Sequence, residues 1–467
     1  MLQKKPLFSR RQAMLPVMLA LLTAPPLRAQ ANPSAPSAPA TAAALLDALV
    51  REALARNLAL AQRDVASQQG AAATRQARGV LLPSLGIDAR YSEFSGVVNI
   101  GDFINPAYAA LNQLLGQDAF PTNVAATLPF RQDTRIKATQ LLVSPAAIAQ
   151  WRLARTLQGL TDAERDLVAR RLAADVQLAW LGLAGSARAV DVWDATLLVL
   201  EENVRVAERL AAAGQGTVDA IYRARADRDE AAQQRADAER RRDAARRTLN
   251  LLLDRDEDTP VPVLDDSTLV APLPTERVTA LGDAVRRREE LRQAALGLDA
   301  AARQKQLATA SFYPTVVLAG EWGIQGDRYR FDGSGNVALA SLVLQWNLFN
   351  GGQDAARREQ ATLEQRKAVL RQREAERAVT RDVADAWDAA RVAQQALATA
   401  DSRVEAARRS FTLTARRYDE GLAPHLEFVA ARSALTQAEL NVILTRFTYA
   451  ARRVELERAT AQRSLTP

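Results

Sequence analysis

Two long stretches of this chain contain no proline, and this feature limits what the chain can fold into more than any other. No proline lies between Pro145 and Pro260 or between Pro314 and Pro424, so each stretch exceeds one hundred residues. In the first stretch apolar residues recur mostly at spacings of three, four or seven, which is typical of one face of a helix. The pattern predicts two helices of about 100 Å each, at roughly 1.5 Å per residue. They are expected over residues 145–213 and 352–420.

Glycine marks the far end of both predicted helices. Gly214 and Gly421 stand where helices commonly end on a residue with positive φ. Thr217 and Pro424 follow them, and both residue types suit the start of a new helix. Because so short a turn reverses the chain, the sequence predicts two antiparallel helical hairpins.

The chain also repeats itself. Trp180 recurs as Trp387 at an offset of 207 residues, which also separates the two tip glycines, and Pro83 recurs as Pro314 at an offset of 231. The difference of 24 residues falls in a connection, residues 92–134, that is longer in the first copy. Self-similarity of this kind predicts two tandem copies of one supersecondary unit.

The expected domain organisation follows from these features. It is a signal peptide (1–31), a flexible leader (32–40), repeat 1 (41–253), a proline-rich linker (254–275) and repeat 2 (276–467). Each repeat should hold a helix, two strands and a long hairpin. Strands are expected near 84–91 and 135–144, with a tip near 214–217, and near 314–324 and 337–349, with a tip near 421–424.

The first thirty-one residues have the features of a secretory signal peptide. Basic residues precede an apolar core at 13–24, and Ala29-Gln30-Ala31 supplies a small-x-small cleavage pattern. Cleavage there removes five basic residues, so the formal charge falls from +7 to +2, with 56 basic and 54 acidic residues. The positive charge is therefore no argument for a nucleic-acid partner, and none is expected.

The residues that usually carry chemistry are scarce. The chain has no cysteine and a single histidine, His425. This excludes disulfides, thiolate metal sites and a cysteine nucleophile, and it leaves no histidine cluster. No nucleophile–base set or phosphate loop is present either. No catalytic residue, metal or cofactor is expected, and the chain is not expected to be an enzyme.

Short segments beside the long helices alternate between apolar and polar residues, which indicates strands with one apolar and one polar face. They are 84–91, 135–143, 315–324 and 338–349. Such strands fit the wall of a membrane barrel, with lipid outside and water inside. Four strands cannot close a barrel, so several chains would have to pool their strands. The aromatic residues of the long connection could mark the lipid interface or plug the mouth; they are Phe94, Phe103, Tyr108, Phe120 and Phe130.

Several motifs of the second copy resemble the TolC-type outer-membrane efflux protein family. They are Phe312-Tyr313-Pro314 before a strand, Trp346-Asn347-Leu348-Phe349-Asn350-Gly351-Gly352 before a long helix, Ala415-Arg416-Arg417-Tyr418-Asp419-Glu420-Gly421 with Leu426-Glu427-Phe428 at the tip, and Ala438-Glu439-Leu440-Asn441. The resemblance implies a mainly α fold with a small β part. Two tandem repeats of a strand pair and a coiled-coil hairpin would make a homotrimeric α/β-barrel, with four strands per chain pooled into a 12-stranded membrane barrel.

The resemblance also implies location and partners. The chain would lie in the outer membrane of a Gram-negative bacterium, in contact with its lipid and with a large periplasmic part. It would dock to a periplasmic adaptor (membrane fusion) protein and an inner-membrane pump. At the tip, Gly214, Gly421, Arg417, Tyr418 and Pro424 are the candidates for adaptor docking.

A ring of carboxylates constricts the tunnel in this family, six residues after the tip glycine. Glu427 holds that position here, whereas Ala430 replaces the second acid of some members. In the first copy the position is Ala220, and the acid is Asp219, one residue earlier. Glu427 and Asp219 are therefore the pore-constriction candidates. Both would equally suit the N-terminus of a helix, where the macrodipole stabilises an acid without any pore.

Two functions follow from the sequence. The first is a passive exit duct of a tripartite efflux or type I secretion system. The alternative is a non-channel periplasmic coiled-coil scaffold or adaptor, although an adaptor is expected to carry one hairpin rather than two. The transported substrate does not follow from the residues.

Overall fold

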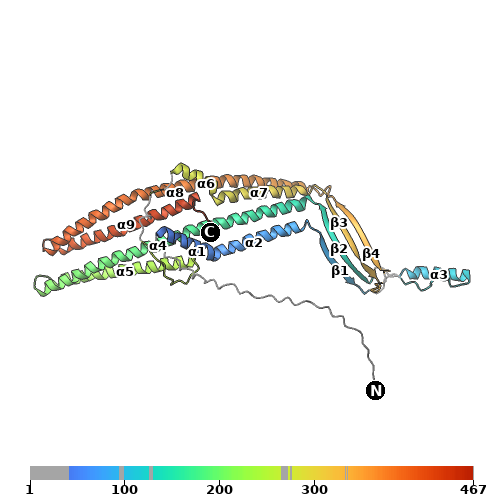
Figure 1. Cartoon of the computed structure of the whole chain (residues 1–467), viewed down its shortest axis with the longest axis horizontal. Coiled ribbons are helices and arrows are strands. Elements are labelled where there is room, and N and C mark those ends of the chain that lie inside the picture. Colours follow the sequence, from blue (N-terminus) through green and yellow to red (C-terminus); the bar gives the residue numbers. More distant parts are fainter. Residues whose placement is uncertain are drawn as a thin grey trace, which may run out of the picture. The chain divides into compact units, whose positions relative to one another are not determined.

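In a computed structural model of the chain, residues 41–465 are described, except 94–98, 126–129, 265–271, 274–275, 332 and 334. The expected signal peptide, the leader and Phe94 lie outside the described residues. The elements are α1 (Ala42–Arg56), α2 (Leu58–Gly79), β1 (Ser84–Tyr91), α3 (Gly101–Leu115), β2 (Gln132–Val143), α4 (Pro145–Ala212), α5 (Val218–Leu252), α6 (Arg277–Arg287), α7 (Glu289–Ala310), β3 (Thr315–Gly326), β4 (Asn336–Gln345), α8 (Gln353–Asp419) and α9 (His425–Thr460) (Figure 1).

The two halves of this order match. Each has a broken helix, two strands and a helical hairpin, and α3 interrupts the order between β1 and β2. The break falls at Asn57 in the first half and at Arg288 in the second, 231 residues later. Asn57 causes its break by accepting hydrogen bonds from the amides of Ala59 and Leu60. The order of elements in the first half therefore recurs in the second.

The long helices begin and end within one residue of their predicted bounds. Ser144 caps α4 by accepting from the amide of Ala147 at 3.2 Å, and Pro145 occupies the first turn, where a missing N–H costs nothing. Gly214 and Gly421 have φ of 68° and 75° after the ends of α4 and α8. Both glycines therefore adopt the left-handed conformation that a reversal requires.

No helix in the described part of the chain is both long and apolar enough to cross a membrane.

The four strands form one antiparallel sheet in the order β1-β2-β3-β4. The pairing is continuous except for a bulge between Leu141 and Val143. β1 and β4 are the two edges, and neither pairs on its outer side with any described strand.

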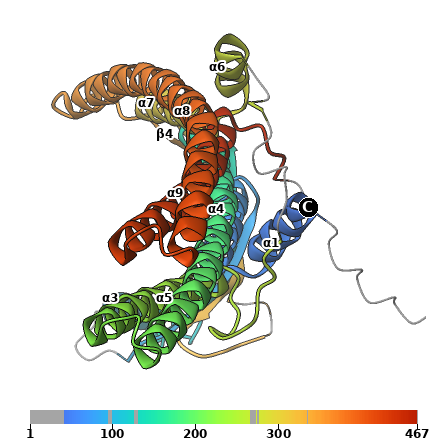
Figure 2. The same cartoon turned by 90° about the vertical axis from the view of Figure 1, so that its left-hand side faces the viewer.

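The helices form a layer that is one helix thick. Near the sheet, α2, α4, α7 and α8 contact one another in that order (Figure 1). Toward the tips, α5 and α9 replace α2 and α7, and the order becomes α5-α4-α9-α8. Viewed from the tip end, this layer is an arc, and α1 and α6 lie on its convex side (Figure 2).

The largest buried cluster lies where α1 packs on α4. Trp180 is fully buried there, and its Nε1 donates to the carbonyl oxygen of Pro262 at 3.1 Å. Val261, Val263 and Leu264 also pack against this cluster. The described start of the proline-rich linker is thus part of the core.

Two local features differ from the expectations. β4 ends at Gln345, before the stretch 346–349 that was expected to continue it. The reason is that Trp346 turns its Nε1 to the carbonyl oxygen of Phe312, at 3.1 Å, as the chain approaches the positive-φ glycines Gly351 and Gly352. The second difference is α3, because only a long loop was expected between β1 and β2.

Candidate functional site

The sheet has one face made mainly of apolar side chains, with the uncharged Gln132, Thr134, Gln140 and Asn336 as its polar members. Paired residues on neighbouring strands point to the same side, so the register places Ile87, Ile136, Trp322 and Ala338 in one row across the sheet. The other apolar residues of this face are Leu85, Ala89, Tyr91, Ala138, Leu318, Ile324, Ala340, Leu342 and Leu344. Ile87 is 72% exposed and Leu342 is 68% exposed. A large exposed apolar surface marks a contact with lipid or protein.

The opposite face carries ion pairs that run across three strands. Lys137 Nζ lies 2.6 Å from Asp88 Oδ2. Arg135 donates to Asp133 at 2.6 Å, to Glu321 at 2.8 Å and to Gln325 at 2.9 Å. The described charged residues of this face are Asp88, Arg90, Asp133, Arg135, Lys137 and Glu321. Three acids thus balance three bases, which suits contact with water and gives this face no net charge.

The second candidate region is the pair of hairpin tips, residues 210–224 and 417–432. At the first tip, the amides of Gln215 and Gly216 donate to the carbonyl oxygen of Leu210, and Thr217 caps α5. At the second, the amides of Leu422 and Ala423 donate to the carbonyl oxygen of Arg417. These bonds close each turn.

The two acids predicted to constrict a pore lie in different surroundings. Glu427, in the first turn of α9, accepts from Arg417 Nη1 at 3.0 Å, which joins α9 to the end of α8. Asp219, in the first turn of α5, pairs with Arg223 of the same helix at 2.6 Å. Both acids are partly exposed. The structure therefore places each in an ion pair of its own hairpin, and Arg417 offsets part of the Glu427 charge.

Tyr418 connects the two hairpins. Its hydroxyl donates to Asn203 Oδ1 of α4 at 3.3 Å, and its ring stacks on Phe428 with centroids 4.7 Å apart. Burial, and to a smaller degree Asp419, raises the pKa of Tyr418. The phenol therefore stays protonated and remains a hydrogen-bond donor. Gly214, Gly421 and Pro424 are exposed on the turns.

A second contact between the hairpins was not anticipated from the sequence. Arg432 of α9 is 6% exposed and donates to Thr196 Oγ1 of α4 at 2.7 Å, while Thr196 also lies 3.1 Å from Thr436. The guanidinium stands over the ring of Phe411 at 5.4 Å. Burial lowers the pKa of Arg432, and Glu439 offsets part of that effect. The sequence signals were the recurrence of Arg225 as Arg432 at the repeat offset of 207 residues and a polar residue, Thr196, at a buried position of α4.

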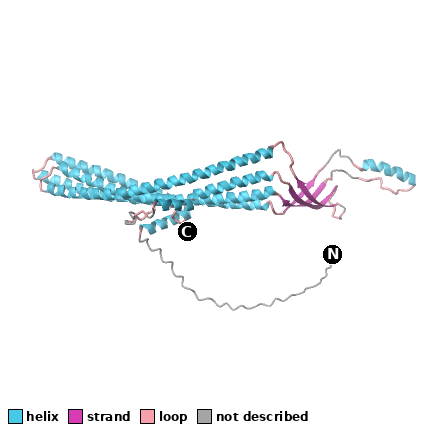
Figure 3. Ribbon diagram, turned by 90° about the horizontal axis from the view of Figure 1, so that it is seen from above, coloured by secondary structure: helices cyan, strands magenta, loops and turns pink. Residues whose placement is uncertain are grey.

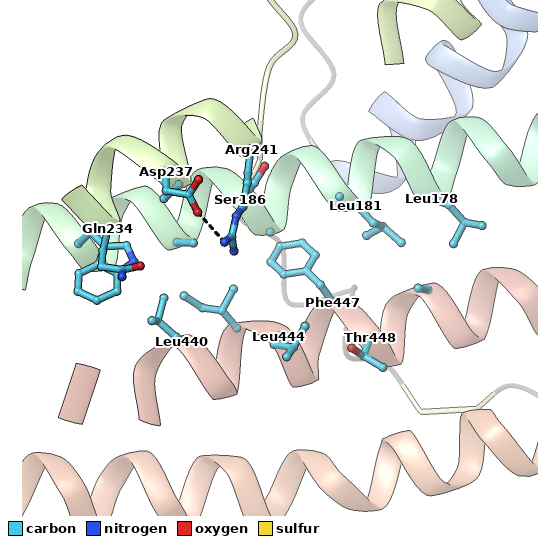
Figure 4. Close-up of a pocket in the computed structure, with 17 residues that line it drawn as sticks. Leu178, Leu181, Ser186, Gln234, Asp237, Arg241, Leu440, Leu444, Phe447 and Thr448 are labelled. Carbon is cyan, nitrogen blue, oxygen red and sulfur yellow. Dashed lines mark hydrogen bonds and ion pairs between the residues drawn. The ribbon is translucent and has the colours of Figure 1, made fainter. Parts of the chain in front are cut away.

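A groove lies above α4 between α5 and α9, away from the tips. It has a volume of about 530 Å³ and is lined mainly by apolar side chains, among them Leu181, Leu440 and Phe447 (Figure 4). Gly185 makes room for Phe447, since a Cβ there would lie 3.2 Å from the ring. Arg241 and Asp237 form an ion pair at 2.6 Å in its lining.

Residues 280–462 match the family model described as outer membrane efflux protein. A stretch of 158 residues is 35% identical to Protein CyaE of Bordetella pertussis, and it covers 32% of each chain. The chain thus spans about a third of the length of that curated relative.

The structural matches extend over most of the chain. The open state of the MtrE outer membrane channel of Neisseria gonorrhoeae is 22% identical, with a TM-score of 0.73 over 89% of this chain and 88% of that one. The outer membrane protein VceC of Vibrio cholerae is 19% identical, with a TM-score of 0.72 over 89% and 95%. CusC is 17% identical, with a TM-score of 0.75 over 89% and 92%.

These matches confirm the fold class predicted from sequence, mainly α with a small β part, and they support the expected outer-membrane location. The fold is that of solved outer membrane channels. Residues 280–462 thus match the outer membrane efflux family that the motifs resemble, and over 89% of its length the chain has the fold of the solved outer membrane channels.

Proposed function

We propose that three copies of this chain form an outer-membrane exit duct that passively conducts substrates from an inner-membrane pump and a periplasmic adaptor. The observation that carries the proposal is the sheet, which has an apolar face, a charge-balanced face and two open edges. An apolar outer face and a polar inner face are what a barrel wall between lipid and water requires.

The open edges argue for pooling of strands. Each backbone group left unpaired in lipid costs several kcal/mol, so a sheet with free edges is not stable within a bilayer. In an antiparallel sheet of four strands, β1 and β4 run in opposite directions. The edge of β4 can therefore pair antiparallel with β1 of the next copy, and repetition closes the barrel. The number three, and thus twelve strands, follows from the family resemblance.

The helical layer continues the duct on the periplasmic side. α4 and α8 each contain more than sixty residues, and their length is about 100 Å at 1.5 Å per residue. An arc of helices in one copy becomes a closed tube when three copies join. At its far end the tips hold the pore-constriction candidates Glu427 and Asp219, and we propose that Gly214, Gly421, Arg417 and Pro424 contact the adaptor. Tyr418 joins the two hairpins through its hydrogen bond to Asn203, and this is its more direct role.

The first prediction tests the duct itself. The full chain, expressed in a Gram-negative host, should fractionate with outer membranes as a trimer that dissociates on heating. The purified trimer should conduct ions in planar lipid bilayers. A soluble monomer without conductance would instead support the alternative of a periplasmic scaffold. A soluble scaffold, however, would not explain why the sheet exposes an apolar face.

The second prediction concerns the charge at the tip. Glu427→Gln removes an acid and leaves Arg417 without its ion-pair partner, so the closed pore should become less selective for cations. The exposed pair contributes at most ~1 kcal/mol, so trimer stability should change little. The measurement is the reversal potential in a salt gradient across a planar bilayer.

The second candidate, Asp219, is compared through Asp219→Asn, which also removes one acid at a helix N-terminus but whose partner Arg223 lies on the same helix. A smaller shift in reversal potential is expected for this variant. If Glu427→Gln left the reversal potential where the unmodified protein has it, Glu427 would have no place in the constriction.

A further inference from the structure

The helix α3 and the segment that returns from it form a small unit at the end of the sheet opposite the hairpins (Figures 1 and 3). It lies in the connection between β1, an edge of the sheet, and β2. Neither the pooled barrel nor the tunnel requires a helix there.

One face of α3 is covered by the returning segment, 117–125, through a pair of matching contacts. The side-chain amide of Asn105 donates to the carbonyl oxygen of Val124 at 2.9 Å and accepts from its amide at 2.8 Å. Asn112, two helical turns later, does the same with Phe120 at 2.7 and 2.8 Å. Tyr108 stacks on Phe120 with centroids 5.3 Å apart. Four hydrogen bonds and one ring contact thus hold α3 in one orientation about its axis.

The fit is close at the start of the helix as well. A Cβ on Gly101 would lie 1.7 Å from the carbonyl oxygen of Val124, so no larger residue is accommodated there. The contacts between α3 and the returning segment therefore determine which face of α3 is turned away from that segment.

That outward face is an unbroken apolar stripe. Its residues recur at helical spacing and are Phe103, Pro106, Ala107, Ala110, Leu111 and Leu114. Phe103 is 73% exposed and Leu114 is 83% exposed. A helix with such a stripe ordinarily buries it against another element, and no described element of the same chain covers it.

Charge argues against an anionic lipid surface as the cover. Within the described residues 99–125 the charged side chains are Asp102 and Asp118, both acidic, and no lysine or arginine is present. Binding to anionic headgroups depends on basic residues. An uncharged stripe with two alanines among larger apolar residues instead suits close packing of helices.

We propose that the α3 stripes of the three copies dock on one another and cover the outer mouth of the barrel. This rests on the trimer proposed above. Since β1 is the strand that would join the next copy, each junction between copies carries one α3, and threefold symmetry places the three helices around a common axis at the same end.

The dimensions agree with this arrangement. Twelve strands spaced about 4.8 Å apart and tilted by roughly 40° give a barrel on the order of 24 Å across. α3 is about 22 Å long, and three helices of about 10 Å diameter packed in a triangle are about 20 Å across. Three copies therefore suffice to cover the mouth.

Cross-linking tests the proposal directly because the chain has no cysteine. Leu114→Cys, in the full chain in outer membranes, should form disulfide-linked dimers on mild oxidation, since thiols near a shared axis have effective concentrations in the mM range. The matched control is Gln113→Cys, an exposed neighbour off the stripe, and roughly tenfold less dimer is expected there. Ala107→Cys, on the stripe, is a second position that should also cross-link.

A second readout is conductance. Leu114→Glu places three like charges at the contact, so the mouth should open and the single-channel conductance should rise while the heat-dissociable trimer persists. The proposal is overturned if both stripe cysteines stay uncross-linked in a sample that migrates as a trimer. If these cysteines are also shielded from a water-soluble maleimide, lipid covers the stripe. Loss of the trimer in the unmodified chain would instead overturn the proposed duct.

Discussion

Replacing Leu342 by arginine is expected to remove the protein from the outer membrane. Leu342 lies on the apolar face of β4, opposite Leu318, and is 68% exposed in the single chain. An arginine facing lipid near the bilayer centre costs about 2–4 kcal/mol. Three copies per trimer raise the cost to roughly 6–12 kcal/mol, which is comparable with the whole free energy of unfolding of an ordinary protein.

The neighbouring Ser341 supplies the control. It lies on the opposite face of the same strand, the face on which β1, β2 and β3 carry their ion pairs, and it is paired with Ala319. Ser341→Arg introduces the same side chain one residue away but directs it to the proposed water-filled interior, so the trimer should survive. The measurement is the amount of heat-dissociable trimer in purified outer membranes for both variants. Equal loss, or no loss in either, would show that the apolar face does not meet lipid.

The sequence was most informative where backbone geometry restricts the choice of residue. Gly214 and Gly421 could be identified as reversals because few other residues adopt positive φ, and their φ values are 68° and 75°. The offsets between the two sequence repeats were equally informative. The offset of 231 residues relates the helix breaks at Asn57 and Arg288, although two different residue types produce those breaks.

Other features could not be predicted because they depend on contacts between distant residues. α3 has Asn105, Pro106 and Asn112 in its sequence, which weaken a helical prediction, and it gains order from bonds to a segment up to nineteen residues away. The buried site of Arg432 is similar: its partner Thr196 is 236 residues away, and a pattern of periodic residues places arginine on the solvated face.

The contact between Arg432 and Thr196, which joins the two hairpins, leads to the second large effect. Arg432 is 6% exposed, and its Nε has no hydrogen-bond partner within the described residues. Thr196→Val preserves the shape of the threonine but removes the acceptor of Arg432 Nη2. A hydrogen bond to a buried charged group contributes about 1.5–3 kcal/mol. Since the bond joins α4 to α9, its loss should let the hairpins separate and raise the conductance of the closed pore.

Two further variants separate an effect on closure of the pore from a general loss of stability. Thr412→Val removes a hydroxyl that bonds only to the carbonyl oxygen of Arg408 in its own helix, so the conductance should not change. Adding Arg432→Met to Thr196→Val removes the buried charge together with its lost acceptor, and the double variant should unfold at a higher temperature than Thr196→Val alone. Conductance in planar bilayers and thermal dissociation of the trimer measure the two effects. If Thr196→Val conducted like the unmodified protein and dissociated at the same temperature, the contact between Arg432 and Thr196 would contribute nothing to closure. The hydrogen bond between Tyr418 and Asn203 would then hold the hairpins together without it.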